Sequence, residues 1–183
     1  MQITPTIRIL AISGSLRANS SNNAVINAAL NYFPPGVKVS IYEGLGSLPH
    51  FNDSKDQAPE VTVFRDQLRL ADGILICSPE YAFGVPGSLK NALDWTVSSG
   101  EFVNKPLALI TAATGGQNAH AALLLIFTAL SANLTPDTTL LVPFIRSKMN
   151  SAGIVDNPGT LNDIKKVVQA LYSLICNQEN EDQ

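Results

Sequence analysis

The segment after the first apolar run of the chain places several hydroxyl and amide side chains around one cation. Arg17 stands among Ser15, Ser20 and Asn22, at the start of an expected helix. The free N–H groups at a helix start, and the positive end of the helix dipole, favour an anion there. A guanidinium among hydroxyls suits a phosphate monoester through charge-assisted hydrogen bonds. Ser and Asn are also common N-caps, so part of the cluster has a purely structural explanation. We interpret the segment as a phosphate site.

A second candidate segment, residues 78–95, follows a buried apolar run and is rich in turn-forming residues. It carries two aromatic rings, Tyr81 and Phe83. Doubly wound sheets place their ligands in loops at the carboxyl ends of central strands. Backbone polar groups beside ring faces suit a flat heteroaromatic ligand with polar edges. The alternative interpretation is an ordinary strand-to-helix connection with a buried Tyr.

A third segment, Thr114-Gly115-Gly116, follows another apolar run. Paired glycines at a strand end let the backbone approach a ring closely. Taken alone, this segment is explained better by a tight turn that starts a helix. Together, the three segments predict a pocket with a phosphate at the first strand and a planar ring between the third and fourth strands. Flavin mononucleotide (FMN) would fill that shape, with its ring edge exposed for reaction.

Strands and helices alternate along the chain and must position these segments. Apolar runs predict strands at Ile7–Ile12, Val37–Tyr42, Gly73–Cys77, Leu107–Ala112 and Thr139–Val142. Helical patterns and stop signals predict helices at Asn22–Tyr32, Pro59–Leu70, Gly87–Ser98, Asn118–Ala132 and Thr160–Cys176. This alternation predicts an α/β fold, a parallel sheet with helices on both faces. Five strands favour the flavodoxin-like, doubly wound order 2-1-3-4-5. A Gly-x-Gly-x-x-Gly spacing is absent after the first strand, which argues against a Rossmann dehydrogenase.

Length and composition are typical of one globular domain. The chain has 183 residues, of which 45% are hydrophobic and 15% charged. We expect a single domain over residues 1–176 and a disordered, polar and acidic tail over residues 177–183. The net charge of −3 gives no basis for binding nucleic acid or a membrane surface. Cys77 and Cys176 lack the spacing of a metal site, and no secretory signal is visible, so we expect a reducing, cytoplasmic location.

Two long motifs stand in order along the chain. The first is Gly14-Ser15-Leu16-Arg17 followed by Ser20 and Asn22. The second is Pro79-Glu80-Tyr81, then Pro86-Gly87, Leu89-Lys90-Asn91-Ala92 and Asp94-Trp95. In these motifs, and in its Leu48-Pro49, Phe51-Asn52 and Gly115-Gly116 pairs, the sequence resembles the NADPH-dependent FMN reductase family. That family consists of flavodoxin-like enzymes that include quinone, azo-dye and chromate reductases, and the resemblance extends over roughly residues 7–175.

The resemblance implies a set of cofactor contacts. It implies phosphate contacts from Ser15, Arg17, Ser20 and Asn22. It implies contacts with the isoalloxazine ring from Pro79, Glu80, Tyr81, Ala82 and Phe83, and from Thr114, Gly115 and Gly116. Two positions depart from the family pattern. Ala82 replaces a common Asn, which removes a side-chain hydrogen bond, and Asn118-Ala119-His120 lacks a cation that relatives often carry, which bears on the preference for NADPH.

The implied function is an FMN-dependent oxidoreductase that passes hydride from NADPH or NADH to a quinone, free flavin or similar small acceptor. The flavin carries this chemistry, so we expect no catalytic side chain and no metal. We interpret Glu80 as a residue that fixes its loop, and His120 as a helix-surface or interface residue. The resemblance also implies a homodimer or homotetramer. Two alternatives are a flavin-binding electron carrier or redox sensor without turnover, and a fold relative that has lost its flavin and serves as an interaction protein.

Overall fold

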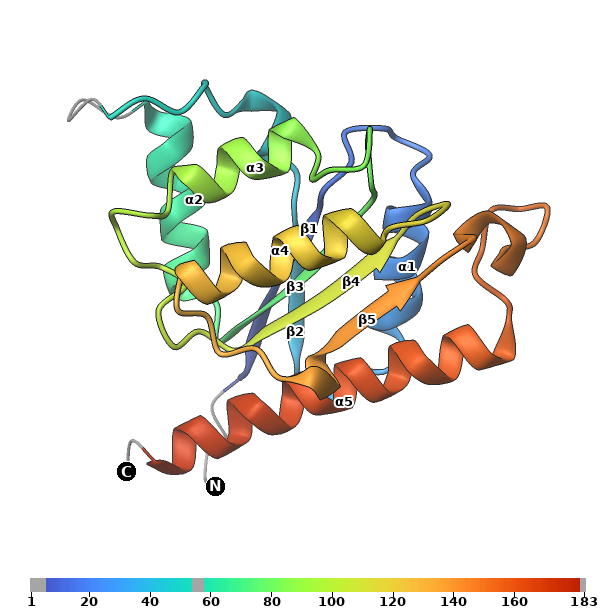
Figure 1. The fold of residues 1–183 in the computed structure, drawn as a ribbon. Coiled ribbons are helices and arrows are strands. Elements are labelled where there is room, and N and C mark those ends of the chain that lie inside the picture. Colours follow the sequence, from blue (N-terminus) through green and yellow to red (C-terminus); the bar gives the residue numbers. More distant parts are fainter. Residues whose placement is uncertain (1–5, 54–57, 182–183) are drawn as a thin grey trace.

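The centre of the molecule is a sheet of five parallel strands in the order β2-β1-β3-β4-β5 (Figure 1). The computed structural model of the protein describes residues 6–53 and 58–181. The strands are β1 (Arg8–Ser13), β2 (Lys38–Tyr42), β3 (Gly73–Ser78), β4 (Leu107–Ala112) and β5 (Thr139–Val142). Every neighbouring pair is parallel, so the strands all end at the same edge. The predicted flavodoxin-like order is therefore confirmed.

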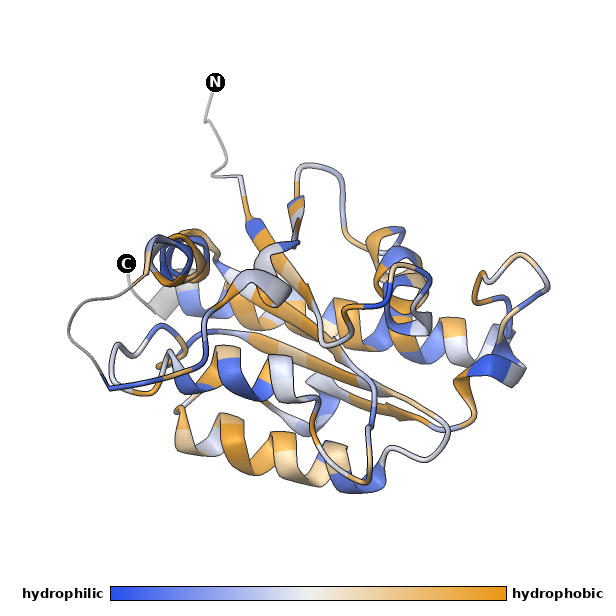
Figure 2. Cartoon of the chain, turned by 90° about the horizontal axis from the view of Figure 1, so that it is seen from above, coloured by the Kyte–Doolittle hydropathy of each residue, from blue (hydrophilic) through white to orange (hydrophobic). Residues whose placement is uncertain are grey.

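Alternate residues of the central strands pack into two separate cores, one on each face of the sheet. In β3, Ile74 and Ile76 belong to one core, and Leu75 and Cys77 belong to the other. This division follows from the period of two along an extended chain. Strands β3 and β4 are buried at every position, which explains their unbroken apolar sequences. Figure 2 shows these strands in hydrophobic colours between the helices.

Helices cover both faces, as predicted. On one face lie α1 (Ser21–Leu30) and α5 (Pro158–Glu181). On the other lie α2 (Pro59–Leu70), α3 (Gly87–Asp94) and α4 (Gln117–Ala129). Three 3₁₀ turns complete the connections: η1 (Gly44–Ser47), η2 (Pro136–Thr138) and η3 (Ile145–Lys148). Among the described residues, no helix is both long and apolar enough to cross a membrane.

Helix α3 ends at Asp94, whereas the sequence predicted an end at Ser98. Beyond Asp94, the N–H groups of Thr96 and Val97 donate to the carbonyls of Leu93 and Asp94, three residues back, so the α-helical pattern ends there. The buried Arg65 of α2 donates hydrogen bonds to the carbonyl oxygen of Trp95, one of them from Nε at 2.9 Å. That carbonyl would otherwise accept the N–H of Ser99 in a continued helix. A long-range bond therefore holds the turn that follows α3.

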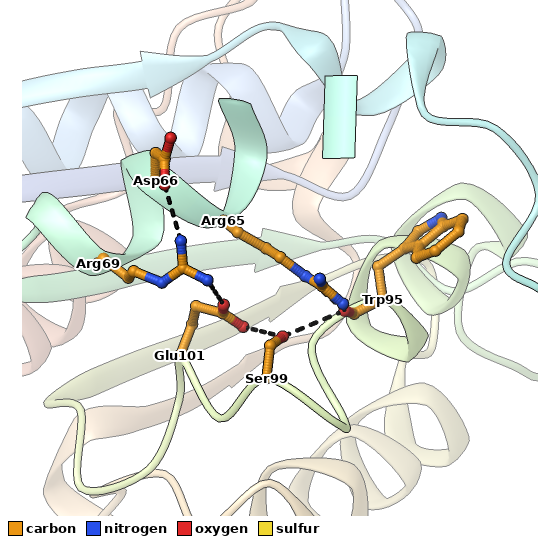
Figure 3. A network of polar contacts seen from close by, with 6 residues as sticks. All are labelled: Arg65, Asp66, Arg69, Trp95, Ser99 and Glu101. Atoms are coloured by element: carbon orange, nitrogen blue, oxygen red, sulfur yellow. Dashed lines mark hydrogen bonds and ion pairs between the residues drawn. The ribbon is translucent and has the colours of Figure 1, made fainter. Parts of the chain in front are cut away.

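The segment after α3 is held to α2 by a small polar network (Figure 3). The side chain of Glu101 is fully buried, and its carboxylate accepts from Arg69 at 2.7 Å and from the Ser99 hydroxyl at 2.5 Å. Arg69 also pairs with Asp66 one turn earlier on α2. Both oxygens of the buried carboxylate are thereby bonded, which offsets the cost of removing its charge from water.

The last helix is longer than predicted. Helix α5 continues to Glu181, beyond the predicted helix end at Cys176. Residues 182–183 lie outside the described residues. Buried apolar side chains, among them Leu171 and Ile175, pack α5 against the core. The polar residues after Cys176 continue this packed helix.

Candidate functional site

A cavity of about 360 Å³ opens at the carboxyl edge of the sheet, a volume typical of small-molecule sites. Four segments form it, those that follow β1, β3, β4 and β5. The residues that line it are Arg17, Asn19, Ser20, Ser21, Asn22, Pro79, Glu80, Tyr81, Ala112, Ala113, Thr114, Ile145, Arg146, Met149, Asn150, Ser151 and Gly153. The three predicted segments thus converge on one cavity.

Not every predicted site residue lines this cavity. Those that do are Arg17, Ser20, Asn22, Pro79, Glu80, Tyr81 and Thr114. Those that do not are Ser15, Ala82, Phe83, Gly115 and Gly116. Of this second group, Ser15, Ala82 and Gly116 act on the shape of the loops through their contacts and backbone angles.

Ser20 starts helix α1 at the wall of the cavity. It adopts an extended backbone, and its hydroxyl accepts the Asn22 N–H at 3.2 Å, as an N-cap does. Arg17 lies on the same wall, and among the described residues no acidic group pairs with it. This end of the cavity therefore combines a cation without a partner, hydroxyl groups and a helix start.

The side chain of Asn22 is engaged within the protein. It is buried, its Nδ2 donates to the Ala112 carbonyl at 3.3 Å, and its Oδ1 accepts from the Cys77 thiol at 3.1 Å. Burial raises the pKa of that thiol far above its usual range, so the thiol remains protonated and donates. Asn22 therefore ties α1 to β3 and β4 through its side chain.

Ser15 connects the first two predicted segments beside the cavity. Its hydroxyl lies 3.1 Å from the Tyr81 hydroxyl and accepts the Arg17 N–H at 3.3 Å. The neighbouring Gly14 permits this approach, because a Cβ there would lie 2.9 Å from the hydroxyl oxygen of Ser78. The glycine of the first motif is thus required for contact between two loops.

The turn after β3 places two residues in a strained conformation. Tyr81 and Gly84 exchange two backbone hydrogen bonds of 3.0 and 2.9 Å, which close a two-residue turn. Its central residues, Ala82 and Phe83, have φ angles of 48° and 59°. Positive φ at both positions is the pattern of a type I′ turn, which favours Asn and Gly. The turn presents Phe83 to solvent, with 80% of its surface exposed.

Glu80 joins the second and third predicted segments. One carboxylate oxygen accepts the Gly116 N–H at 3.2 Å, and the other accepts the Ala119 N–H at 2.9 Å. These hydrogen bonds, led by that of Ala119, lower the pKa of Glu80 below its usual value. Glu80 therefore caps α4 as an anion, in agreement with the interpretation that it fixes its loop.

Gly116 needs this external cap because it has no side chain of its own. Its φ is +103°, and a Cβ at this position would lie 2.8 Å from Leu141. His120, one turn into α4, is half-buried, and its Nδ1 lies 2.9 Å from the hydroxyl of the buried Thr111. Burial lowers the pKa of His120. His120 is absent from the cavity lining.

Residues of the second motif beyond the turn hold a neighbouring loop. The indole of Trp95 and the amide of Asn91 both donate to the Pro49 carbonyl, at 2.9 and 3.0 Å. Asn91 also accepts the Phe51 N–H at 2.7 Å, and the Phe51 ring meets Trp95 edge-on at 5.1 Å. These contacts are structural and explain why the Leu48–Asn52 loop accompanies the motif.

The segment after β5 supplies the residues that the sequence reasoning missed. Ile145, Arg146, Met149, Asn150 and Ser151 line the cavity together with Gly153. Their place is set by the third predicted segment, since the Phe144 N–H donates to the Thr114 carbonyl at 3.1 Å. The sequence does indicate where this segment lies. It follows the fifth predicted parallel strand, so it must start at the carboxyl edge of the sheet, where doubly wound folds bind their ligands.

The cavity fits FMN by the chemistry of its lining. Arg17, the hydroxyls and the start of α1 provide donors and positive charge for a phosphate ester. The segments after β3 and β4 provide Tyr81 and small residues for a flat ring. Glu80 is the one acidic residue in the lining, and its charge is directed at the helix start. In the described residues, no cluster suited to a metal ion is found.

The fold and site define a flavodoxin-like protein with a mononucleotide pocket at its strand ends. The family model that matches the sequence is that of the NADPH-dependent FMN reductases, and the match covers residues 7–146. The chain therefore belongs to the NADPH-dependent FMN reductase family, as the motifs predicted.

Known proteins agree with this assignment. The sequence is 38% identical over 114 residues to an NAD(P)H-dependent FMN reductase of Pseudomonas aeruginosa, over 60% of this chain and 61% of that one. It is 38% identical over 122 residues to an NADPH:quinone oxidoreductase of Arabidopsis thaliana, over 62% of this chain and 61% of that one. The chain thus spans about three fifths of the length of these relatives. In fold it resembles the flavoenzyme NAD(P)H:(acceptor) oxidoreductase FerB of Paracoccus denitrificans, with a TM-score of 0.75, 22% identity, and coverage of 93% of this chain and 98% of that one.

The strained turn predicts a stabilising substitution. Replacing Ala82 with Gly should raise the free energy of unfolding by about 0.5–1 kcal/mol, because Gly adopts positive φ without steric cost. Denaturant unfolding measures the change. The same substitution at Ala121, exposed in the middle of α4, is the control and should lower stability by about 0.5–1 kcal/mol. Destabilisation by Ala82→Gly would contradict the assigned turn.

The cap of α4 predicts a pH-dependent loss in Glu80→Gln. At pH 7 this variant should lose about 1 kcal/mol of stability, the usual value of a helix cap. Because folding lowers the pKa of Glu80, its contribution is present above the unfolded value of about 4.3 and disappears as pH falls through the folded pKa. Thermal unfolding from pH 7 to 3 should show the two proteins converge. The exposed Glu43→Gln serves as the control and should show a smaller loss at pH 7. An unchanged difference at pH 3 would contradict the role of the Glu80 charge.

Proposed function

We propose that the protein is an FMN-dependent NAD(P)H oxidoreductase that reduces a quinone, a free flavin or a similar small acceptor. The observation that carries this proposal is one cavity that joins Arg17 and the start of α1 to the Tyr81 turn and the Thr114 segment. Family membership supports the choice of cofactor. Bound FMN would accept hydride from a reduced nicotinamide and pass electrons to the acceptor, chemistry that protein side chains do not supply.

The residues on the β1 side would hold the phosphate. Arg17 would donate charge-assisted hydrogen bonds to it, and the backbone N–H groups at the start of α1 would face it. The Ser20 hydroxyl is already used as an acceptor by the Asn22 N–H, but its own proton remains available to a phosphate oxygen.

The residues on the β3 and β4 side would orient the ring. The turn that starts at Tyr81 is closed by its own hydrogen bonds and tied to α4 by Glu80, so it presents backbone groups in a fixed arrangement. Such preorganisation lowers the entropy cost of placing a ligand. Glu80 is held ionised at neutral pH and accepts two N–H groups, so its part is to position the turn and not to donate a proton.

The quinone acceptor and the nicotinamide donor are inferred from relatives. The relative from Arabidopsis thaliana is an NADPH:quinone oxidoreductase, and the relative from Pseudomonas aeruginosa is an NAD(P)H-dependent FMN reductase. At the start of α4, this chain carries Asn118 and a His120 whose pKa is lowered by burial, and neither is a cation at neutral pH. We therefore leave both NADPH and NADH as donors.

Turnover tests the proposed activity. Protein loaded with FMN should oxidise NADPH or NADH at a rate that rises when a soluble quinone is added. The control is the same assay without protein and with FMN alone, which measures the non-enzymatic reaction. Bound flavin without turnover would contradict the enzyme assignment and support an electron carrier or redox sensor.

Removal of Arg17 tests the phosphate site. Arg17→Ala should weaken FMN binding by about 1.5–3 kcal/mol, the range for a hydrogen bond to a charged group. Quenching of flavin fluorescence in a titration measures the dissociation constant. Lys38→Ala is the control, since Lys38 stands at the start of β2, at the opposite edge of the sheet, and should leave the affinity unchanged. An unaltered affinity in Arg17→Ala would show that the anion site is misassigned.

A homo-oligomer is also proposed, and the outward face of α4 supports it. The helix has no charged residue between Gln117 and Ala129, and its outward Leu125 is 73% exposed. An uncharged helix face with an exposed leucine can enter a contact between subunits without the cost of burying a charge. We also propose a cytoplasmic location, supported by Cys77, a free thiol in the buried core.

The oligomer is tested by Leu125→Glu. Light scattering should find a dimer or tetramer for the wild type and a monomer for this variant, because two like charges would be buried in the contact. Leu70→Glu is the matched control: Leu70 is 59% exposed at the end of α2, and its substitution should leave the assembly intact. A monomeric wild type would contradict the proposed assembly, and an assembled Leu125→Glu would show that α4 is not the contact.

A further inference from the structure

We infer that Arg146 forms a second cationic contact for the phosphate of FMN, in addition to Arg17; this inference rests on the proposed function. Arg146 belongs to η3, the turn after β5, and lines the same cavity as Arg17 and the start of α1. Neither family motif contains it. Arg146 is the last residue that the family model matches. The cavity-lining residues that follow it in the sequence therefore lie outside the matched region.

The position of Arg146 is fixed by the loop that precedes α4. The N–H groups of Phe144 and Ile145 donate to the carbonyls of Thr114 and Ala113, at 3.1 and 3.2 Å. Ile145 is buried against the core, and Phe144 adopts a φ of 53°. A side chain on this turn is therefore held at the rim of the cavity by backbone contacts, and loss of the Arg146 side chain should not disturb them.

The wall beyond Arg146 is a short hairpin closed by its own bonds. Met149 and Val155 form an antiparallel bridge, and Val155 is buried. The Asn150 Oδ1 accepts the N–H groups of Ala152 and Ile154, at 3.0 and 3.1 Å. With its oxygen used in this way, Asn150 has its amide NH₂ left to donate, and the adjacent Ser151 adds a hydroxyl to the cavity lining. The wall thus presents donors beside Arg146.

Charge favours a phosphate monoester as the group bound between the two arginines. Among the described residues, no acidic group pairs with Arg17 or Arg146. The cavity thus gathers two guanidinium groups although the chain has a net charge of −3. The one carboxylate in the lining, that of Glu80, is bonded to the start of α4. A phosphate monoester carries a charge of about −1.5 to −2 at pH 7, which two cations match and one does not.

The test compares FMN with riboflavin, which lacks the phosphate. For Arg146→Gln, we expect the dissociation constant of FMN, measured by flavin fluorescence in a titration, to rise about ten-fold or more. For riboflavin we expect a change of less than about two-fold, because no phosphate contact is lost. Arg146→Lys keeps the charge without the forked donor and should fall between the wild type and Arg146→Gln.

Lys148→Gln is the matched control. Lys148 lies two residues further along the same turn and is absent from the cavity lining, so its removal changes the net charge equally without a contact. Its FMN affinity should change less than about two-fold. Equal weakening in Lys148→Gln and Arg146→Gln would overturn the inference, because it would show an effect of overall charge.

The remaining outcomes separate this inference from the proposed function. A wild type that binds neither FMN nor riboflavin overturns the proposed function, and the inference with it. A wild type that binds FMN, with unchanged affinity in Arg146→Gln, overturns the inference alone. Equal weakening of FMN and riboflavin in Arg146→Gln also overturns the inference alone, since it assigns Arg146 to the wall and not to the phosphate.

Discussion

One carboxylate holds together the segments that follow β3 and β4. Glu80 follows β3 in the sequence, yet it accepts the N–H groups of Gly116 and Ala119 at the start of α4. Gly116 cannot cap its own helix, so the helix depends on a neighbouring loop for its first acceptors. The two loops therefore cannot separate without leaving N–H groups unbonded. The Tyr81 turn, the Thr114 segment and the wall beyond β5 are all placed relative to this junction.

The family motifs combine residues that face the cavity with residues that shape it. Arg17 faces the cavity without an acidic partner among the described residues, whereas the side chain of Asn22 is buried and bonds to β3 and β4. In the second motif, Asn91 and Trp95 hold the Pro49 carbonyl and do not reach the cavity. A motif can therefore be long and specific while only part of it contacts a ligand, because the loops must also be held.

Local sequence patterns predicted the topology because each strand and helix carries its own apolar period, and the order 2-1-3-4-5 follows from that alternation. They also predicted three of the four segments around the cavity. The end of α3 was missed because neither the change to shorter-range backbone bonds after Asp94 nor the Arg65 contact that holds the following turn has a signal in the local sequence. The role of Arg146 was missed because its position depends on contacts between the turn after β5 and the Thr114 segment. Such contacts between distant segments have no local sequence pattern. The strain at Ala82 likewise depends on φ, which Ala does not reveal in a sequence.

The central claim is that the segments after the strands jointly bind one FMN. A crystal structure of the protein grown with FMN tests it most directly. We expect the phosphate between Arg17 and the start of α1, and the flavin ring against the Tyr81 turn and the Thr114 segment. Flavin bound elsewhere on the protein, or in this cavity with its phosphate directed away from Arg17, would contradict the account.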